Sequence, residues 1–359
     1  MKRSMVTLTF GLLAALYSAA QSPAFNQEIF DRAMKAIAPQ QTLVFRAPAE
    51  VIEEALTPAD LVGFDIMQNG EAVTGAPLTL SAANEIELIL YWRIVWRPEG
   101  IMKYRIEIAD SGPKVTKDLA VQTKAWQPGG VYKTRIILPM RPLAYSGTGA
   151  FRVVQVGAEK APVLCDVPVM VNPILTESSL EADTVKLGDK AQWLGVAFRL
   201  GPNATLTIPC AGVSVPEGMG PIPTRIGVIS SVAYEPHLAE GEAVAVVQIV
   251  ANGVNQCTRE VKAGEDTAIT DWDYFDPENL THKKAEVYGS TSASYPNAAG
   301  ESFEKQQYIG WLPIEAETTP TELIFTYARS KGVLDVKGLV LDFAQDVPAP
   351  EGAEGAPAE

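Results

Sequence analysis

Short segments of alternating apolar and polar residues, separated by glycine and proline, recur through most of this chain and constrain its fold more than any other feature. The alternation begins near Leu61 and is clear in Ile86–Trp96 and Val244–Val250. Successive side chains of a strand point to opposite faces, so a two-residue period predicts β-strands. The segments are rich in β-branched residues, and 28 glycines and 26 prolines supply turns between them. The chain is therefore predicted to be mainly β.

The strand-like segments form two blocks. In residues 61–172, turn sequences such as Pro98–Gly100 and Pro128–Gly130 separate the segments, which predicts an immunoglobulin-like β-sandwich. Residues 173–183 are predicted to be a linker, and about eight segments in residues 184–346 predict a second, jelly-roll-like sandwich. The segments of the second block are Trp193–Phe198, Ala204–Ile208, Ile226–Ser230, Val244–Val250, Ala285–Tyr288, Tyr308–Trp311, Glu322–Tyr327 and Gly338–Asp342.

Two other segments have a different pattern. Apolar residues from Phe25 to Ile37 recur at helical spacing and end before Pro39, so residues 21–60 are predicted to be a short helical lead-in. Residues 347–359 contain mainly Pro, Gly, Glu and Ala. Such a segment buries too little apolar surface to order itself, which predicts a disordered acidic tail.

The first 20 residues have the pattern of a secretion signal. Lys2 and Arg3 precede a short apolar run, which ends at Ser18–Ala20 before Gln21. A basic start, an apolar core and small residues at the cleavage site define a signal peptide, and the run is too short to span a bilayer. We expect cleavage after Ala20, no membrane span in the mature chain, and a periplasmic or extracellular location.

Charge and cysteine content limit the partners and the covalent cross-links. The formal net charge is −14, which disfavours nucleic acid as a partner. An oxidising compartment permits disulfides, and Cys210 and Cys257 fall in the same predicted domain while Cys165 falls in the other. Any disulfide is therefore predicted to join Cys210 to Cys257, with Cys165 reduced and buried; three buried free thiols are the alternative.

Short motifs in both blocks carry a resemblance to a known group of domains. The first block contains Leu88–Trp92 and Gly149–Gly157, and the second contains Ile229–Tyr234 and Ala263–Ala268. With these motifs the chain resembles exported bacterial tandem β-sandwich domains, including the galactose-binding-like jelly roll, of the kind appended to envelope glycosyltransferase-type proteins. The resemblance implies a β-sandwich and a role with carbohydrates, and it assigns no functional residue. The chain differs from that group in having no membrane segment.

No catalytic motif stands out. The chain has two histidines, and neither has metal-ligand spacing; no GxSxG and no phosphate-binding glycine loop is present. Carboxylate pairs that hydrolyse glycosides have no sequence signature of their own, because the separation of the two groups defines them. No catalytic residue is predicted.

The densest polar and aromatic segment runs from Asp266 to His282. It is predicted to be a long acidic loop between strands. As a candidate ligand site it offers Trp272 and Tyr274 for stacking on sugar rings, together with Asp266 and His282, although aromatic residues of a β protein more often pack in the core. The alternative to a plain loop is a calcium site, with oxygen ligands from Asp271, Asp273 and Asp276.

These observations predict a secreted, non-catalytic binding protein whose partner is an envelope or extracellular glycan. Two alternatives stay open. One is a structural or protein-interaction module of the cell envelope that binds an envelope protein. The other is a polysaccharide-active hydrolase on a jelly-roll scaffold. No cofactor is predicted other than the alternative calcium ion.

Overall fold

The computed structural model describes residues 32, 35, 41–42, 59–94, 100–109, 115–127, 130–140, 146–157, 163–210, 215 and 217–345. The predicted signal peptide, most of the predicted helical lead-in and the predicted acidic tail lie outside these residues. Within the lead-in, Arg32 and Lys35 are helical, whereas Gln41–Thr42 (β1) is a strand and the next strand already begins at Ala59. No helix in the described residues has the length and apolar character needed to cross a bilayer.

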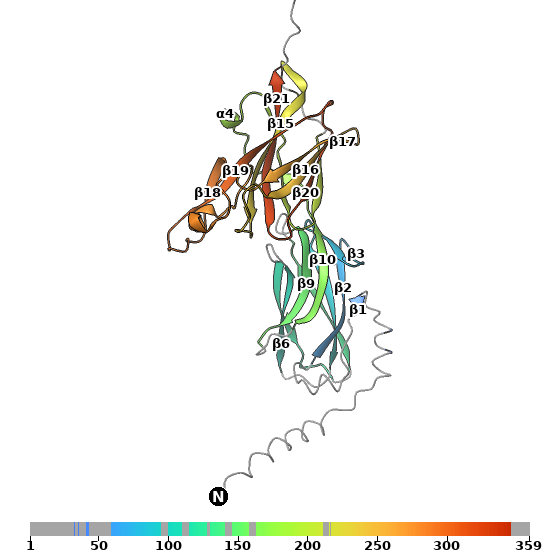
Figure 1. Cartoon of the computed structure of the whole chain (residues 1–359). Helices are drawn as coiled ribbons and strands as arrows, with labels where there is room; N and C mark the ends of the chain where they lie inside the picture. Colours follow the sequence, from blue (N-terminus) through green and yellow to red (C-terminus); the bar gives the residue numbers. More distant parts are fainter. Residues whose placement is uncertain are drawn as a thin grey trace, which may run out of the picture.

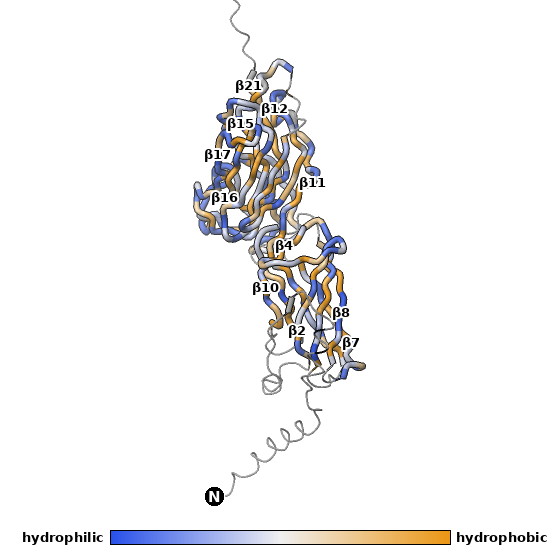
Figure 2. The backbone as a smooth tube through the Cα atoms, turned by 90° about the vertical axis from the view of Figure 1, so that its right-hand side faces the viewer, coloured by the Kyte–Doolittle hydropathy of each residue, from blue (hydrophilic) through white to orange (hydrophobic). Residues whose placement is uncertain are grey.

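The fold is mainly β, as the two-residue period predicts. Within the described residues, ten strands precede residue 173, and hydrophobic residues follow the strands in both halves of the molecule (Figure 2). After β1 these strands are Ala59–Gln68 (β2), Glu71–Ala72 (β3), Leu78–Ser81 (β4), Ile86–Ile94 (β5), Ile101–Ala109 (β6), Val115–Gln122 (β7), Val131–Leu138 (β8), Gly147–Gln155 (β9) and Val163–Asn172 (β10).

Strands β1 to β10 form the N-terminal sandwich. One sheet has the order β1-β2-β5-β8, with β3 beside β2, and the other has the order β4-β10-β9-β6-β7. Aromatic rings meet between the sheets: Phe64 contacts Phe151 at 4.9 Å between ring centroids, and Trp92 stacks on Tyr104 at 4.4 Å. All four rings are buried, so alternate residues of both sheets share one hydrophobic core.

Strands β11 to β21 form the C-terminal sandwich. A seven-stranded sheet has the order β11-β13-β21-β15-β19-β18, with β12 beside β21, and a four-stranded sheet has the order β14-β20-β16-β17. Phe198 of the larger sheet meets Phe325 of the smaller one at 5.1 Å in the core between them. The strands are Thr176–Glu177 (β11), Ala191–Trp193 (β12), Val196–Leu200 (β13), Thr205–Pro209 (β14), Met219–Ala233 (β15), Ala243–Ala251 (β16), Val254–Lys262 (β17), Val287–Ser292 (β18), Glu304–Pro313 (β19), Glu322–Tyr327 (β20) and Val333–Gln345 (β21).

The connections contain a few helical turns. A four-residue helix, Thr184–Leu187 (α4), precedes β12. The 3-10 turns Trp272–Tyr274 (η1) and Pro277–Asn279 (η2) lie in the long connection between β17 and β18, and Figure 1 shows a short coil beside β18 at one side of the C-terminal sandwich. The predicted linker is not wholly irregular, because β11 within it pairs with β13.

The two sandwiches lie end to end and meet closely at one place (Figure 1). The Thr148 amide donates a hydrogen bond to the Pro202 carbonyl at 2.8 Å, and the Ser146 hydroxyl donates to the Arg199 carbonyl. A Cβ on Gly201 would lie 1.8 Å from the Ser146 carbonyl oxygen, so this approach requires glycine. The division into separate immunoglobulin-like and jelly-roll domains stays a prediction.

Candidate functional site

A polar cavity of about 620 Å³ lies on the outer face of the seven-stranded sheet. Along β13 and β21, apolar residues such as Phe198 and Val336 point into the core. The residues that alternate with them on each strand therefore point outward. Arg199 and Asp335 are two such outward residues, and they are direct cross-strand partners. Strands β15, β18 and β19 and the segments that follow β11, β15, β17 and β18 complete the lining.

Charged side chains form two ion-pair groups in this cavity. In the first, Asp335 Oδ2 accepts from Arg199 Nη2 at 2.8 Å and lies 3.1 Å from Lys337 Nζ. In the second, Lys305 Nζ lies 3.6 Å from Asp271 Oδ1, and the Tyr295 hydroxyl donates to Asp271 Oδ2 at 2.8 Å. Cross-strand register creates the first group, and the connection after β17 brings Asp271 to the second.

Several polar atoms of these groups are buried without a hydrogen-bond partner among the described residues. They are Arg199 Nε, Asp335 Oδ1 and Asp271 Oδ1. A buried polar atom without a partner is destabilising by about 1–3 kcal/mol, so such atoms are rare and need an explanation. All three atoms belong to residues that line the cavity, and Asp271 Oδ1 has the ammonium group of Lys305 nearby at 3.6 Å, so two of the three have no charged or hydrogen-bonding partner among the described residues.

An exposed aromatic residue stands at the edge of the cavity. Tyr234 follows β15, is 60% exposed and has a φ of 64°. The other described non-glycine residues with positive φ are Asn69, Asn203 and Asn252, the residue type that tolerates this conformation best. Tyrosine in this conformation is unfavourable, and residues held in such conformations concentrate at binding and active sites.

The connection between β17 and β18, residues 263–286, packs on the larger sheet and forms one wall of the cavity. Val232 on β15 donates its amide to the Ala268 carbonyl at 2.9 Å and accepts from the Thr270 amide at 2.7 Å. A Cβ on Gly310 of β19 would lie 2.4 Å from the Asp266 Cβ, so the connection touches the sheet backbone directly. Hydrogen bonds of strand type therefore fix the position of Asp271.

Trp272 and His282, which the sequence suggested as ligand-binding residues, are buried inside this connection. Trp272 is 8% exposed and meets His282 edge-on at 5.2 Å between ring centroids. His282 Nδ1 lies 3.0 Å from the Leu238 carbonyl, and Nε2 accepts from the Ile269 amide at 3.4 Å. Burial lowers the pKa of His282, which favours this neutral form. Neither ring faces the cavity; both hold the connection together.

The other predicted binding residues also have internal partners. Tyr274 is half-buried among aromatic rings, with Tyr295 and Phe303 at 6.3 and 5.7 Å. Asp266 accepts from the Lys262 amide at 2.9 Å, and burial raises the pKa of its carboxyl group.

The three aspartates of the predicted calcium site point to separate partners. Asp271 binds Tyr295 and Lys305, and Asp273 binds Lys284 and Gln306. Asp276 accepts from the Glu278 amide at the start of η2. No three His, Cys, Asp or Glu side chains in the described part of the chain gather closely enough to hold a metal ion. Of the predicted site residues, Asp271 alone lines the cavity.

The predicted disulfide is not formed in the structure. Cys165, Cys210 and Cys257 are free, the first two buried and the third half-buried. Cys210 follows β14 and Cys257 lies on β17, the two outer strands of the four-stranded sheet. Three strand spacings separate them, about 14 Å, whereas a disulfide needs Cα atoms within about 7 Å.

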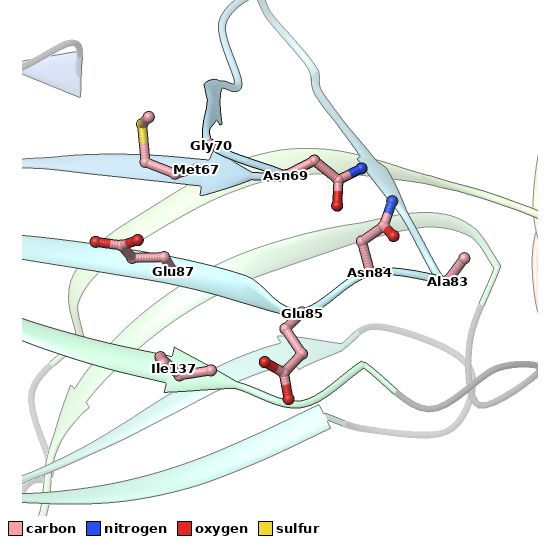
Figure 3. Close-up of a pocket in the computed structure, with 8 residues that line it drawn as sticks. All are labelled: Met67, Asn69, Gly70, Ala83, Asn84, Glu85, Glu87 and Ile137. Atoms are coloured by element: carbon pink, nitrogen blue, oxygen red, sulfur yellow. The ribbon is translucent and has the colours of Figure 1, made fainter.

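A second cavity of about 440 Å³ lies beside two turns of the N-terminal sandwich (Figure 3). Asn69 and Asn84 belong to these turns, and Figure 3 shows their side chains pointing toward one another. Glu87 at its side is paired with Arg135 at 2.5 Å. No aromatic ring or cation is among its lining residues, so it offers a ligand fewer kinds of contact than the cavity beside Tyr234.

Sequence and structure comparisons add little to this site. No protein-family model and no curated protein sequence matches the chain. Solved structures similar to it include the C-terminal domain of wzt, with a TM-score of 0.22, 12% identity, and coverage of 32% of this chain and 74% of that one. The C-terminal domain of the Streptococcus pyogenes antigen I/II-family protein AspA has a TM-score of 0.23 and 10% identity, covering 80% and 91% of the two chains. An exo-beta-1,3-galactanase from Phanerochaete chrysosporium, solved with galactose, has a TM-score of 0.19 and 9% identity, covering 79% and 69%. With TM-scores this low, none of the three bears on the site or its ligand.

Proposed function

We propose that this chain is a non-catalytic glycan-binding protein and that its binding site is the cavity beside Tyr234. The exposed Tyr234, held at positive φ where the other such residues are asparagines, is the observation that carries the proposal. A tyrosine ring packs on the apolar face of a sugar, and neighbouring charged groups hydrogen-bond its hydroxyls. Export through the predicted signal peptide belongs to the same proposal.

Tyr234→Ala is the first test. We expect the purified wild-type protein to bind some of the glycans on an array. The variant should bind the same glycans about tenfold more weakly, a loss of about 1.4 kcal/mol in binding free energy. Val254→Ala is the matched control, because Val254 is 61% exposed but lies on β17 of the other sheet. Unchanged glycan binding by Tyr234→Ala would overturn the proposal.

Tyr234→Asn separates binding from folding. Asparagine adopts positive φ more readily than tyrosine, so the free energy of unfolding of this variant should equal that of the wild type or exceed it by up to about 1 kcal/mol. Its glycan binding should nevertheless be lost. Thermal unfolding and the glycan array measure the two effects on one sample. A variant that lost stability as well would identify Tyr234 as a structural residue.

Two carboxylates, Asp271 and Asp335, line the cavity, and the hydrolase alternative requires two such groups. Incubation of the wild type with each retained glycan, followed by a reducing-sugar assay, tests this second function. Sugar release that Asp271→Asn abolishes would replace the binding proposal with hydrolysis; no release supports binding alone.

A further inference from the structure

The charge balance of the cavity is opposite to that of the whole chain. The chain contains 43 acidic and 29 basic residues. Among the residues that line the cavity, three are basic (Arg199, Lys305 and Lys337) and two are acidic (Asp271 and Asp335). An acidic protein thus presents a local excess of positive charge at the site where we propose that it binds its ligand.

The ion pairs place the positive charges toward solvent. Asp335 shares one carboxylate oxygen between two cations, so a single negative charge faces Arg199 and Lys337. The Asp335 side chain is 11% exposed, whereas those of Arg199 and Lys337 are 29% and 26% exposed. A ligand that enters the cavity therefore meets the cations before the carboxylate.

Lys305 has the same arrangement at the other side of the cavity. Its ammonium group lies over the Tyr295 ring at 4.9 Å and beside Asp271, and it is more exposed than that aspartate, at 35% against 27%. Burial lowers its pKa, but Tyr295 and Asp271 more than offset this, so the net pKa is raised and the group stays charged.

We infer that the ligand is an acidic glycan, whose sugar rings carry anionic substituents such as carboxylate groups; this inference rests on the proposed glycan-binding function. The ring of Tyr234 packs on the sugar, and Lys305, Lys337 and Arg199 bind the anionic substituents through charge-assisted hydrogen bonds. These bonds are the stronger class, so the anionic substituents decide which glycans the cavity selects.

The test compares neutral, uronate-containing and sulfated glycans on one array. We expect the wild type to retain the acidic glycans, and binding to weaken in about 0.5 M NaCl, where screening shortens the reach of exposed charges. Comparing the uronate-containing with the sulfated glycans shows whether the cavity binds carboxylate or sulfate groups. Methyl esterification of a retained uronate glycan keeps the sugar and removes its charge, and should weaken binding about tenfold.

Lys305→Met removes one cavity charge while keeping the aliphatic stem, and should weaken acidic-glycan binding about tenfold. Lys283→Met is the matched control, because Lys283 is 76% exposed and pairs with Glu240 away from the cavity. If the wild type binds neutral glycans as strongly as acidic ones, and Tyr234→Ala loses this binding, the inference of an acidic ligand is overturned but the proposed function is intact. Retention of no glycan at all would overturn both.

Discussion

His282 illustrates how one buried polar side chain stabilises, from within, the connection that forms a wall of the proposed binding site. Its two ring nitrogens face Leu238 and Ile269, and the ring is 5% exposed. The Leu238 carbonyl requires a donor at Nδ1, and the Ile269 amide requires an acceptor at Nε2. Only the neutral ring supplies both. The protonation state of His282 is therefore linked to the stability of the connection that carries Asp271.

We expect this linkage to make the protein less stable as the pH falls. Burial lowers the pKa of His282 in the folded chain, so below about pH 6.5 the unfolded chain binds a proton that the folded chain does not. The free energy of unfolding then decreases from about pH 6.5 downward, until the folded group is protonated too. Thermal unfolding measured between about pH 8 and pH 5 records this decrease.

Two variants assign the decrease to this residue. His282→Gln keeps one donor and one acceptor and removes the titration, so its unfolding should depend less on pH than that of the wild type. His237→Gln alters the other histidine, which is exposed, and serves as the control. Equal pH dependence in all three proteins would contradict the linkage. His282→Ala should lose about 1–3 kcal/mol even at neutral pH, because the buried Ile269 amide loses its acceptor, whereas the Leu238 carbonyl keeps the Thr281 hydroxyl as a donor.

At this scale the sequence identified residue types better than their roles. Trp272 and His282 lie in a dense polar and aromatic segment, and nothing local reveals that their rings are buried. Arg199 and Asp335 occupy ordinary outward positions of alternating strands, and only the register of β13 against β21 joins them. Tyr234 had one usable signal, since it directly follows the apolar segment that forms β15, where a turn residue such as Asn would be more typical.

At the scale of secondary-structure elements, the start of β9 contacts the turn after β13. This contact links the N-terminal sandwich to the part of the C-terminal sandwich that carries the proposed site. The Ser146 hydroxyl donates to the carbonyl of Arg199, whose side chain lines the cavity. A side chain of the N-terminal sandwich thus supports the backbone of Arg199, a charged residue of the proposed binding site. Gly201, in the same turn, permits this approach.

Gly201→Ala should therefore destabilise the protein by about 1–3 kcal/mol, because its new methyl group would overlap the Ser146 carbonyl and force the backbone apart. Gly289→Ala is the matched control: Gly289 lies in β18, and its Cβ would meet nothing within 4 Å. Urea unfolding of both variants measures the difference. Equal stability of the two would show that the contact is not maintained in solution.

The sequence predicted most strand positions but not their ends. Ile86–Trp96 corresponds to β5, and Val244–Val250 to β16. The predicted strand Trp193–Phe198 is divided between β12 and β13, because Gly195 between them has a φ of 65°. A glycine in a short apolar segment fits both a strand and a break, and the tertiary pairing with β21 determines the outcome.

On the scale of the whole molecule, the two hydrophobic cores are distinct and each contains one buried cysteine. Cys165 belongs to the core of the N-terminal sandwich, and Cys210 to that of the C-terminal sandwich. Burial and the charge of Asp166 raise the pKa of Cys165 to about 12, and burial and Glu322 raise the pKa of Cys210 to about 11. Thiolates are the reactive form, so both thiols should be inert while their cores are folded.

This pair of cysteines can test whether the sandwiches are separate domains, as the sequence predicts. We expect Cys165 and Cys210 to react with a thiol reagent at different urea concentrations at about pH 8, because each becomes accessible when its own core unfolds. Peptide mass mapping identifies which thiol reacted at each concentration. Cys257, half-buried at the sheet edge, should react before either and reports that the reagent is active. If Cys165 and Cys210 become reactive together at one urea concentration, the two sandwiches unfold as a single cooperative unit, and the contact at Gly201 couples them more strongly than a boundary between independent domains would.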